Sequence, residues 1–219
     1  MEFDFSLIIH SIPLLLRGAG LTLEITALAV GLGLLIGLVA SLAQLSKSPL
    51  LRLPAKVYVD CIRGTPLLIQ IFIIYFALPN IIGHRIDPFI AAVTACSLNS
   101  GAYIAEIFRG GIQSIDRGQY EGAKVLGMTY VQTMRRIILP QVIKRVLPPV
   151  SNETINLLKD TSLVYILAMN DILRITRSIV QRDFDTTAFL VAAVFYLFFT
   201  FILTKVFGYL EKRYAVYDE

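Results

Sequence analysis

Acidic residues inside long apolar stretches are the positions of this sequence best suited to chemistry. Glu153, Asn156 and Asp160 have the spacing i, i+3 and i+7, which puts all three on one face of a helix. Because an ionised side chain inside a membrane costs about 2.5–3.5 kcal/mol on insertion scales, such residues are usually functional. Two carboxylates on one face can bind an ammonium group. Alternatively, Glu153, Lys159 and Asp160 form salt bridges that pack helices together.

Polar residues that could bind a carboxylate lie in two earlier apolar stretches. Thr65 followed by Pro66 predicts the N-cap and first residue of a helix, whose free N–H groups attract anions. Gln70 follows in that helix, and Asn99 and Ser100 lie in the next stretch. Together with the acidic face, these residues fit a free amino acid. The excess of acids over bases in the apolar stretches favours a cationic side chain, as in arginine, lysine or histidine. The candidate substrate-binding residues are Glu153, Asp160, Asn156, Asn99, Ser100, Thr65 and Gln70.

The composition indicates that a membrane surrounds the elements that hold these residues. The chain has 219 residues, of which 56% are hydrophobic and 16% are charged, and its mean hydropathy is +0.69. Soluble domains carry about 25% charged residues. Several stretches nearly free of charge are long enough for a membrane helix, which takes roughly 17–25 residues. We therefore predict an all-α integral membrane protein. It has a single domain, 1–219, with five transmembrane helices at 21–46, 58–80, 86–107, 146–169 and 186–208.

The basic residues predict how the chain is oriented. The net charge is +4 at pH 7, and most Lys and Arg lie after the first span, after the third span and in the tail. Short cytoplasmic loops accumulate Lys and Arg, so we predict a multi-pass membrane protein whose basic loops face the cytoplasm. Its N-terminus lies outside and its C-terminus is cytoplasmic. Because topology explains the charge, nucleic acid is not expected as a partner.

The sequence contains no pattern typical of an enzyme or a metalloprotein. His10 and His84 are far apart in the sequence, and it has neither a P-loop nor a nucleophile elbow. We therefore predict no catalytic residue, no metal site and no cofactor bound by this chain.

The long connection after the third span, 110–140, predicts a structure of its own. Asp116 with Gln119 is a loose capping box that starts a helix, and Gly127 suits the left-handed residue after its end. Thr129 with Gln132 is a second capping box. The expected result is a cytoplasmic helix-turn-helix, with Tyr120, Ala123 and 126–128 available for docking. Alternatively, this basic and amphipathic segment lies on anionic lipid.

Prolines and glycines predict where helices break or approach one another. We expect Pro140 to interrupt the second loop helix, and Pro148-Pro149 to break or kink the helix before the fourth span. Gly33-x-x-x-Gly37 lets two helices approach closely, either within one subunit or between two.

Four ordered segments between residues 63 and 163 carry a family resemblance. The loop has Glu121-Gly122-Ala123, then Gly127, then Ile137-Ile138-Leu139-Pro140, which resembles the EAA loop of ATP-binding-cassette (ABC) importer permeases. Three further segments resemble the polar amino-acid branch of that family, which includes histidine, glutamine and arginine permeases. They are 63–70 (RGTPLLIQ), 97–111 (SLNSGAYIAEIFRGG) and 156–163 (NLLKDTSL).

This resemblance implies a type I ABC importer permease fold, a place in a prokaryotic cytoplasmic (inner) membrane, and a division of labour between subunits. Glu121, Gly122, Ala123 and Gly127 would couple the loop to a partner ATPase dimer, which holds the ATP and Mg²⁺. The other implied partners are a second permease subunit (a second copy or a paralogue) and an extracytoplasmic amino-acid-binding protein. ATP hydrolysis in the partner would then drive alternating access. The chain itself would be a transporter subunit and not an enzyme.

Two other classes of function remain open from the residues alone. An ion- or proton-coupled secondary amino-acid transporter or channel would use Glu153 and Asp160 as ion sites. A passive membrane anchor for a soluble partner would not need an acidic helix face in the membrane.

Overall fold

The protein is described by a computed structural model over residues 5–214, and in that range its regular secondary structure is entirely helical. Side chains are described from residue 12 onward, and residues 1–4 and 215–219 lie outside the description. The helices are α1 Phe5–Leu45, α2 Pro49–Arg63, α3 Leu67–Phe72, the π-helix η1 Ile73–Ala77, α4 Leu78–Ile82, α5 Pro88–Gln113, α6 Arg117–Val125, α7 Tyr130–Thr133, the π-helix η2 Met134–Ile138, α8 Leu139–Asp160, the 3₁₀-helix η3 Thr161–Leu167, α9 Ile172–Asp183 and α10 Thr187–Tyr214.

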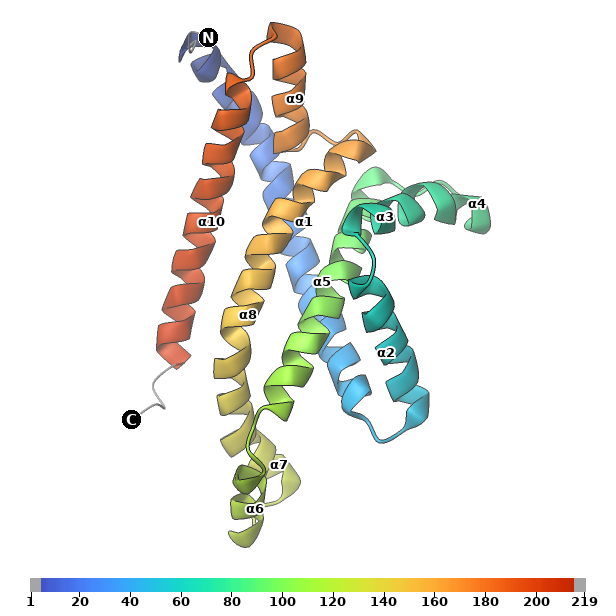
Figure 1. Ribbon diagram of the computed structural model, residues 1–219, viewed down its shortest axis with the longest axis vertical. Coiled ribbons are helices and arrows are strands. Elements are labelled where there is room, and N and C mark those ends of the chain that lie inside the picture. Colours follow the sequence, from blue (N-terminus) through green and yellow to red (C-terminus); the bar gives the residue numbers. More distant parts are fainter. Residues whose placement is uncertain (1–4, 215–219) are drawn as a thin grey trace.

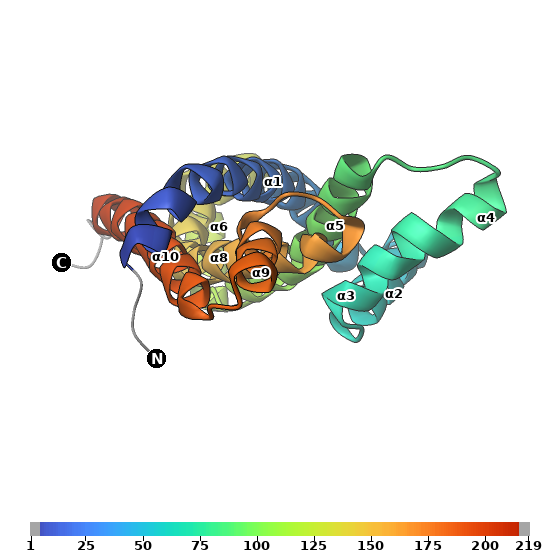
Figure 2. The same cartoon turned by 90° about the horizontal axis from the view of Figure 1, so that it is seen from above.

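Four long helices, α1, α5, α8 and α10, run along the length of the molecule (Figure 1). Seen from above, α2, α3 and α4 project to one side of these helices (Figure 2). The start of α1 and all of α9 lie toward one end, whereas α6 and α7 lie at the other (Figure 1). The end of α10 and the turn between α1 and α2 also lie toward the α6–α7 end, so the basic segments gather there, as predicted. The chain ends themselves fall outside the described residues, and the orientation in the membrane stays a prediction.

Length and composition identify candidate membrane spans among the described helices. Three helices qualify, namely α1 over Ile12–Leu45, α5 and α10. A fourth results if α2 and the segment Leu67–Ile82 form one span, although the two are bent by 108°. The helix α8 is long enough, but Glu153, Lys159 and Asp160 are among the charges that make it less apolar. The count of five spans therefore stays a prediction.

The paired glycines of α1 pack within the subunit. A Cβ at Gly33 would lie 3.2 Å from the Cβ of Ser100, and one at Gly37 would clash with Ile104. On α5, a Cβ at Gly101 would clash with Ile36. Small residues on both helices thus let α1 and α5 approach closely, which settles the alternative left open by the sequence.

The second predicted span, 58–80, is not one straight helix. The chain turns at Gly64–Pro66, and Pro66 with φ −62° and ψ 139° precedes α3. Thr65 is therefore not the N-cap that its sequence predicts. Its hydroxyl donates to the carbonyl of Cys61 at 2.9 Å, so Thr65 binds the last turn of α2 and does not cap α3. Proline forces the residue before it out of the helical region, which explains the turn.

The two prolines of α8 do not break it, contrary to expectation. α8 starts already at Leu139 and runs through Pro148 and Pro149 to Asp160, with η3 continuing to Leu167. Pro140 does not interrupt the helical path either, because α8 follows directly on the π-helix η2. Buried residues lie on both sides of the proline pair, and their packing outweighs the tendency of proline to break a helix. They are Val142, Val146 and Val150.

Candidate functional site: a polar helix face and a coupling surface

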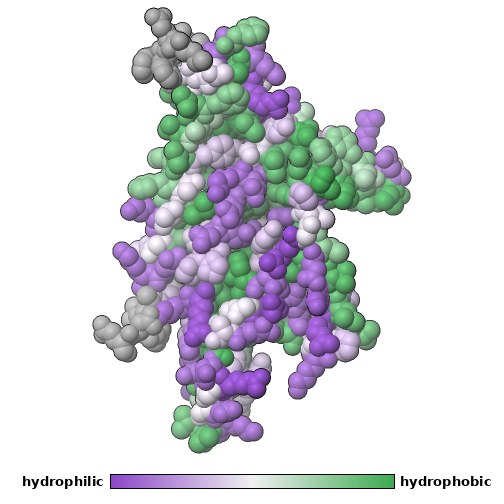
Figure 3. Space-filling view, viewed as in Figure 1, coloured by the Kyte–Doolittle hydropathy of each residue, from purple (hydrophilic) through white to green (hydrophobic). Residues whose placement is uncertain are grey.

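The polar face predicted on α8 is present and uncovered in the single chain. Asn156, Lys159 and Asp160 are exposed and Glu153 is half-buried. Hydrophilic residues gather over the middle of α8 between hydrophobic regions (Figure 3). Among the described residues, neither acid nor Lys159 has an ion-pair partner, so the salt-bridge alternative is absent within the subunit. The face is free to meet water, a ligand or another subunit.

Glu153 also reaches the interface between α8 and α5. Its carboxylate approaches the hydroxyl of Ser100, which is fully buried. That hydroxyl makes no hydrogen bond of ordinary geometry with any described residue. A buried hydroxyl without a partner is uncommon. The Glu153 carboxylate is the polar group that faces this hydroxyl, so the two side chains link α8 to α5 beside the acidic face.

Three other candidate residues meet each other at the bend of the second span. The Gln70 amide nitrogen donates to the carbonyl of Ile62 at 2.8 Å and to that of Thr65 at 3.0 Å. The Asn99 amide nitrogen of α5 donates to the Gln70 carbonyl oxygen at 3.0 Å. Because Gln70 binds carbonyls at the end of α2 while sitting in α3, this network fixes the bend and ties it to α5. The structure thus divides the seven candidates between the α8 face with Ser100 and the bend.

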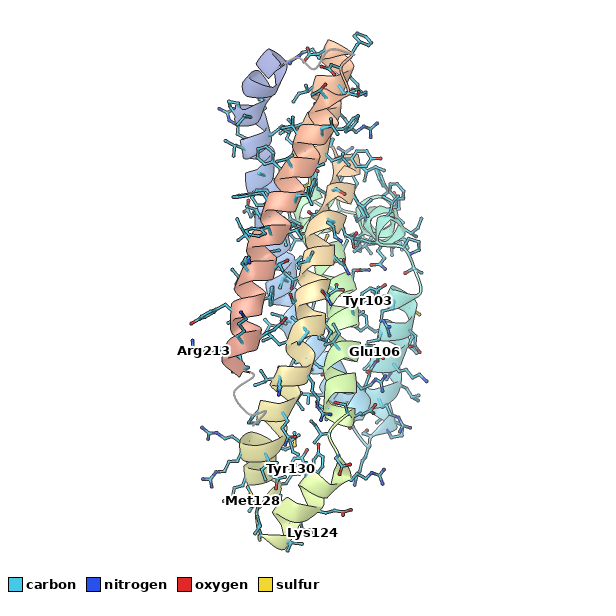
Figure 4. All side chains as sticks on the ribbon, turned by 60° about the vertical axis from the view of Figure 1, so that its left-hand side comes forward. Tyr103, Glu106, Lys124, Met128, Tyr130 and Arg213 are labelled. Atoms are coloured by element: carbon cyan, nitrogen blue, oxygen red, sulfur yellow. The ribbon has the colours of Figure 1, made fainter. Side chains whose placement is uncertain are left out.

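A cluster of ionic residues lies on the same side of α5, below the bend. Glu106 binds Arg109 through two hydrogen bonds of 2.8 and 2.7 Å, and Arg63 at the end of α2 lies 3.4 Å from it. The Arg63 guanidinium also lies over the Tyr103 ring, 5.4 Å from its centroid. Tyr103 and Glu106 point toward α2 (Figure 4). The acid at position 106 is therefore an interhelical contact rather than part of the α8 face.

The loop 110–140 forms the helix-turn-helix predicted for it. The Asp116 carboxylate accepts from the Gly118 amide at 2.6 Å and caps α6, although Gln119 does not complete the box. Gly127 has φ +71°, a left-handed conformation that favours glycine. Thr129 and Gln132 form a complete capping box at α7.

The tip of this loop exposes acidic and apolar residues together. Glu121, Gly122 and Gly127 are exposed, but Ala123 is only 2% exposed and packs inward, so it is not available for docking as predicted. Tyr120 is half-buried for the same reason. Lys124, Met128 and Tyr130 mark the tip in Figure 4. Four exposed apolar residues define what we call the coupling patch: Val125, Leu126, Tyr130 and Val131. Of these the sequence had indicated only Leu126, because an apolar residue on a short helix has no periodicity to reveal its direction.

The loop is attached firmly to the two helices that flank it. Ile115 before α6 packs with Ile138, Val142 and Val146 in one cluster. The Arg145 guanidinium of α8 donates to the carbonyl oxygen of Ser114, and to its hydroxyl at 2.9 Å. A movement imposed on the loop would therefore reach α5 and α8 together.

The described residues contain no group of three or more His, Cys, Asp or Glu side chains that could hold a metal ion.

Comparisons with known proteins agree with these features. Residues 29–216 match the family model described as "Binding-protein-dependent transport system inner membrane component". The chain is 42% identical to the glutamine transport system permease protein GlnP of Escherichia coli (strain K12) over 218 residues, covering 99% of this chain and 100% of GlnP. It is 37% identical to the arginine transport system permease protein ArtQ of Bacillus subtilis (strain 168), covering 97% of this chain and 98% of ArtQ.

A solved structure extends the likeness to the fold. A chain in the crystal structure of an amino acid ABC transporter with histidines is 38% identical, with a TM-score of 0.90. The match covers 97% of this chain and 100% of that one, so the fold is that of a type I importer. Such relatives are transporter subunits and not enzymes, with the ATPase in a separate subunit. The chain therefore belongs to the family of binding-protein-dependent transport system inner membrane components, in its branch of amino-acid ABC importer permeases.

Proposed function

We propose that this permease imports polar amino acids with a basic side chain, such as arginine, lysine or histidine. The observation that carries the proposal is the α8 face, where neither Glu153 nor Asp160 forms a salt bridge within 4 Å with a described residue and where Lys159 is the one cation that acts on Asp160. A carboxylate in an apolar surrounding favours a positively charged partner strongly. The cationic substrate would supply that partner, and the Ser100 hydroxyl would add a hydrogen bond.

The working transporter in this proposal needs several further subunits. A second copy or a paralogue covers the α8 face and completes the pathway. An ATPase dimer binds Glu121 and the coupling patch, and it holds the ATP and Mg²⁺, so this chain binds neither. An extracytoplasmic binding protein delivers the amino acid to the end of the molecule that carries α9.

The attachment of the loop supports alternating access as the mechanism. ATP binding and hydrolysis in the partner move the loop, and the Arg145–Ser114 contact and the Ile115 cluster pass that movement to α5 and α8. Because Ser100 lies on α5 and Glu153 on α8, a change in their packing opens or closes the site between them.

The substrate is tested by removing one negative charge from the face. In the reconstituted transporter, Glu153→Gln lowers arginine uptake about tenfold or more, since a charged hydrogen bond is lost. Glutamine uptake by the same variant stays within about twofold. Glu211→Gln, the same change at the end of α10, is the control and leaves both rates unchanged. Unaltered arginine kinetics in Glu153→Gln would refute the basic-substrate site.

The partner is tested at the loop. Glu121→Lys reverses an exposed charge beside the coupling patch, so we expect the ATPase to dissociate or to lose its response to substrate. Glu211→Lys is the matched control. Transport that continues in Glu121→Lys, or in the absence of any ATPase, would instead identify the ion-coupled secondary transporter.

A further inference from the structure

A cleft between α1 and α9 has walls of two chemical kinds. Its volume is about 530 Å³, within the range of roughly 300–1,000 Å³ that is usual for ligand sites. Arg17 comes from α1 and Arg182 from α9, so cationic side chains from two helices line it. The remaining lining residues are Leu14, Leu21, Asn170, Ile175, Ser178 and Ile179.

The packing around Asp171 fixes this cleft in the fold. Asp171 is fully buried, and its carboxylate caps α9 by accepting from the Leu173 amide at 3.0 Å and the Arg174 amide at 3.1 Å. A Cβ at Gly18 would lie 2.9 Å from the Asp171 carbonyl carbon and 2.8 Å from Ile175 Cδ1. α1 and α9 therefore meet at a contact that only glycine allows, and the cleft lies beside it.

The two arginines differ in what already binds them. Arg182 forms hydrogen bonds of 2.7 and 2.6 Å with Asp183. Arg17 is exposed and forms no ion pair with any other residue of the described part. Asn170 is exposed at the edge of the cleft. The cleft thus offers an unpaired guanidinium, a second guanidinium and an amide to an anion.

The position of the cleft brings it to a membrane surface. The charge-free stretch of α1 begins after Glu24, seven residues beyond Arg17, and α10, the next candidate span after α9, starts at Thr187. α9 buries Ile172 and Ile179 against α1 and α10, and it carries its arginines on other faces, where they can meet lipid headgroups. A ligand here meets lipid headgroups on one side and acyl chains on the other.

We propose that this cleft binds an anionic phospholipid. The phosphate group contacts Arg17 and Arg182, and an acyl chain lies along Leu14, Leu21 and Ile175. Both parts are needed to explain the lining, because a free phosphate or amino acid would leave the aliphatic wall without a partner. A planar guanidinium binds phosphate with two hydrogen bonds, which favours arginine at such a site.

The chain lacks tryptophan, so one introduced tryptophan reports on the cleft. Leu14→Trp places it at a lining residue that is 40% exposed. The assembled transporter is reconstituted with brominated phosphatidylglycerol or brominated phosphatidylcholine at equal mole fraction. We expect brominated phosphatidylglycerol to quench the Trp fluorescence and to bind with about fivefold or higher affinity than brominated phosphatidylcholine. The reason is that basic residues near a membrane surface attract anionic lipid. The double variant Arg17→Gln with Arg182→Gln brings the ratio of the two lipid affinities to about one, because it loses the attraction between arginine and the anionic headgroup.

Two matched controls distinguish lipid binding in the cleft from a general effect of the protein's positive charge. Leu197→Trp puts the reporter on the outer face of α10, where both lipids quench equally. Lys205→Gln with Arg213→Gln removes the same charge elsewhere and leaves the ratio at Leu14→Trp unchanged. Equal quenching by the two lipids at Leu14→Trp overturns the proposal. So does the absence of quenching, which would mean that protein covers the cleft, and so does displacement by free arginine.

A second measurement needs no tryptophan. Native mass spectrometry of the unaltered transporter, released from mixed phosphatidylglycerol and phosphatidylcholine, counts the lipids that remain bound. One retained phosphatidylglycerol per permease subunit that disappears with Arg17→Gln and Arg182→Gln supports the site. No difference between the two proteins contradicts it.

Discussion

Gly111 of α5 lies so close to Val146 of α8 that a Cβ at position 111 would overlap the Val146 Cγ1. This contact lies near the end of α5, where the loop 110–140 begins, and it is four residues before Ile115, which joins Val146 in one buried cluster. The neighbouring Gly110 has open space around it, with nothing within 4 Å of an added Cβ. The two adjacent glycines therefore have different roles, although their sequence contexts look alike.

Gly111→Ala should separate α5 from α8 at the base of the loop. Overpacking of this kind costs about 1–3 kcal/mol of folding free energy. We expect a lower unfolding temperature and a weaker stimulation of the partner ATPase by substrate. Gly110→Ala is the matched control and should keep both quantities near those of the unaltered protein. Equal behaviour of the two variants would contradict the close contact.

The Asn99–Gln70 hydrogen bond should stabilise the bend of the second span. Asn99→Ala leaves the buried Gln70 carbonyl oxygen without its donor, which costs about 1–3 kcal/mol. Asn80→Ala is the control, because Asn80 is exposed and donates only to Phe76 within its own turn. Thermal unfolding of the two purified variants measures the difference, and an unfolding temperature for Asn99→Ala as high as that of the control would show that the bend needs no such bond.

Arg145 should matter for coupling more than for folding. Arg145→Met removes the guanidinium that binds Ser114 but keeps an apolar stem on α8. We expect ATP hydrolysis to continue while transport per ATP falls, because the loop no longer moves α8 with it. Arg135→Met, at an exposed position of η2, serves as the control. Transport and hydrolysis that fall in the same proportion would instead indicate a general loss of assembled transporter.

Asp171 should make stability depend on pH. Burial raises the pKa of Asp171 to about 6, whereas the backbone amides of Leu173 and Arg174 act in the opposite direction. The folded state therefore binds a proton more tightly than the unfolded state, whose carboxyl titrates near 3.8. Stability from this group is fully present below about pH 4 and falls as the pH rises to about 6, by about 2–3 kcal/mol at most.

The comparison with Asp171→Asn isolates that contribution. The unaltered protein should gain more unfolding temperature than the variant when the pH is lowered from 7 to 5. The same gain in both proteins would show that other groups produce the pH dependence.

Local spacing alone predicted much of this protein. Capping pairs such as Thr129 and Gln132, and a glycine such as Gly127, act over three or four residues, so the helix-turn-helix could be found without a fold. The acidic face of α8 followed in the same way from the helical repeat. Charge density along the chain located the apolar helices, because burying a charge in lipid is costly wherever it occurs.

Tertiary structure decided which polar residues meet. Gln70 and Asn99 are 29 positions apart and bind each other only because α3 lies on α5, so no periodicity reveals the pair. The prolines of α8 show the same limit, since packing of Val146 and Val150 outweighs a local break. A helix cap or a helical face depends on residues that are neighbours along the chain, so it can be predicted from the sequence. Whether a polar side chain is satisfied or free depends on partners brought by other helices, and only the folded chain determines them.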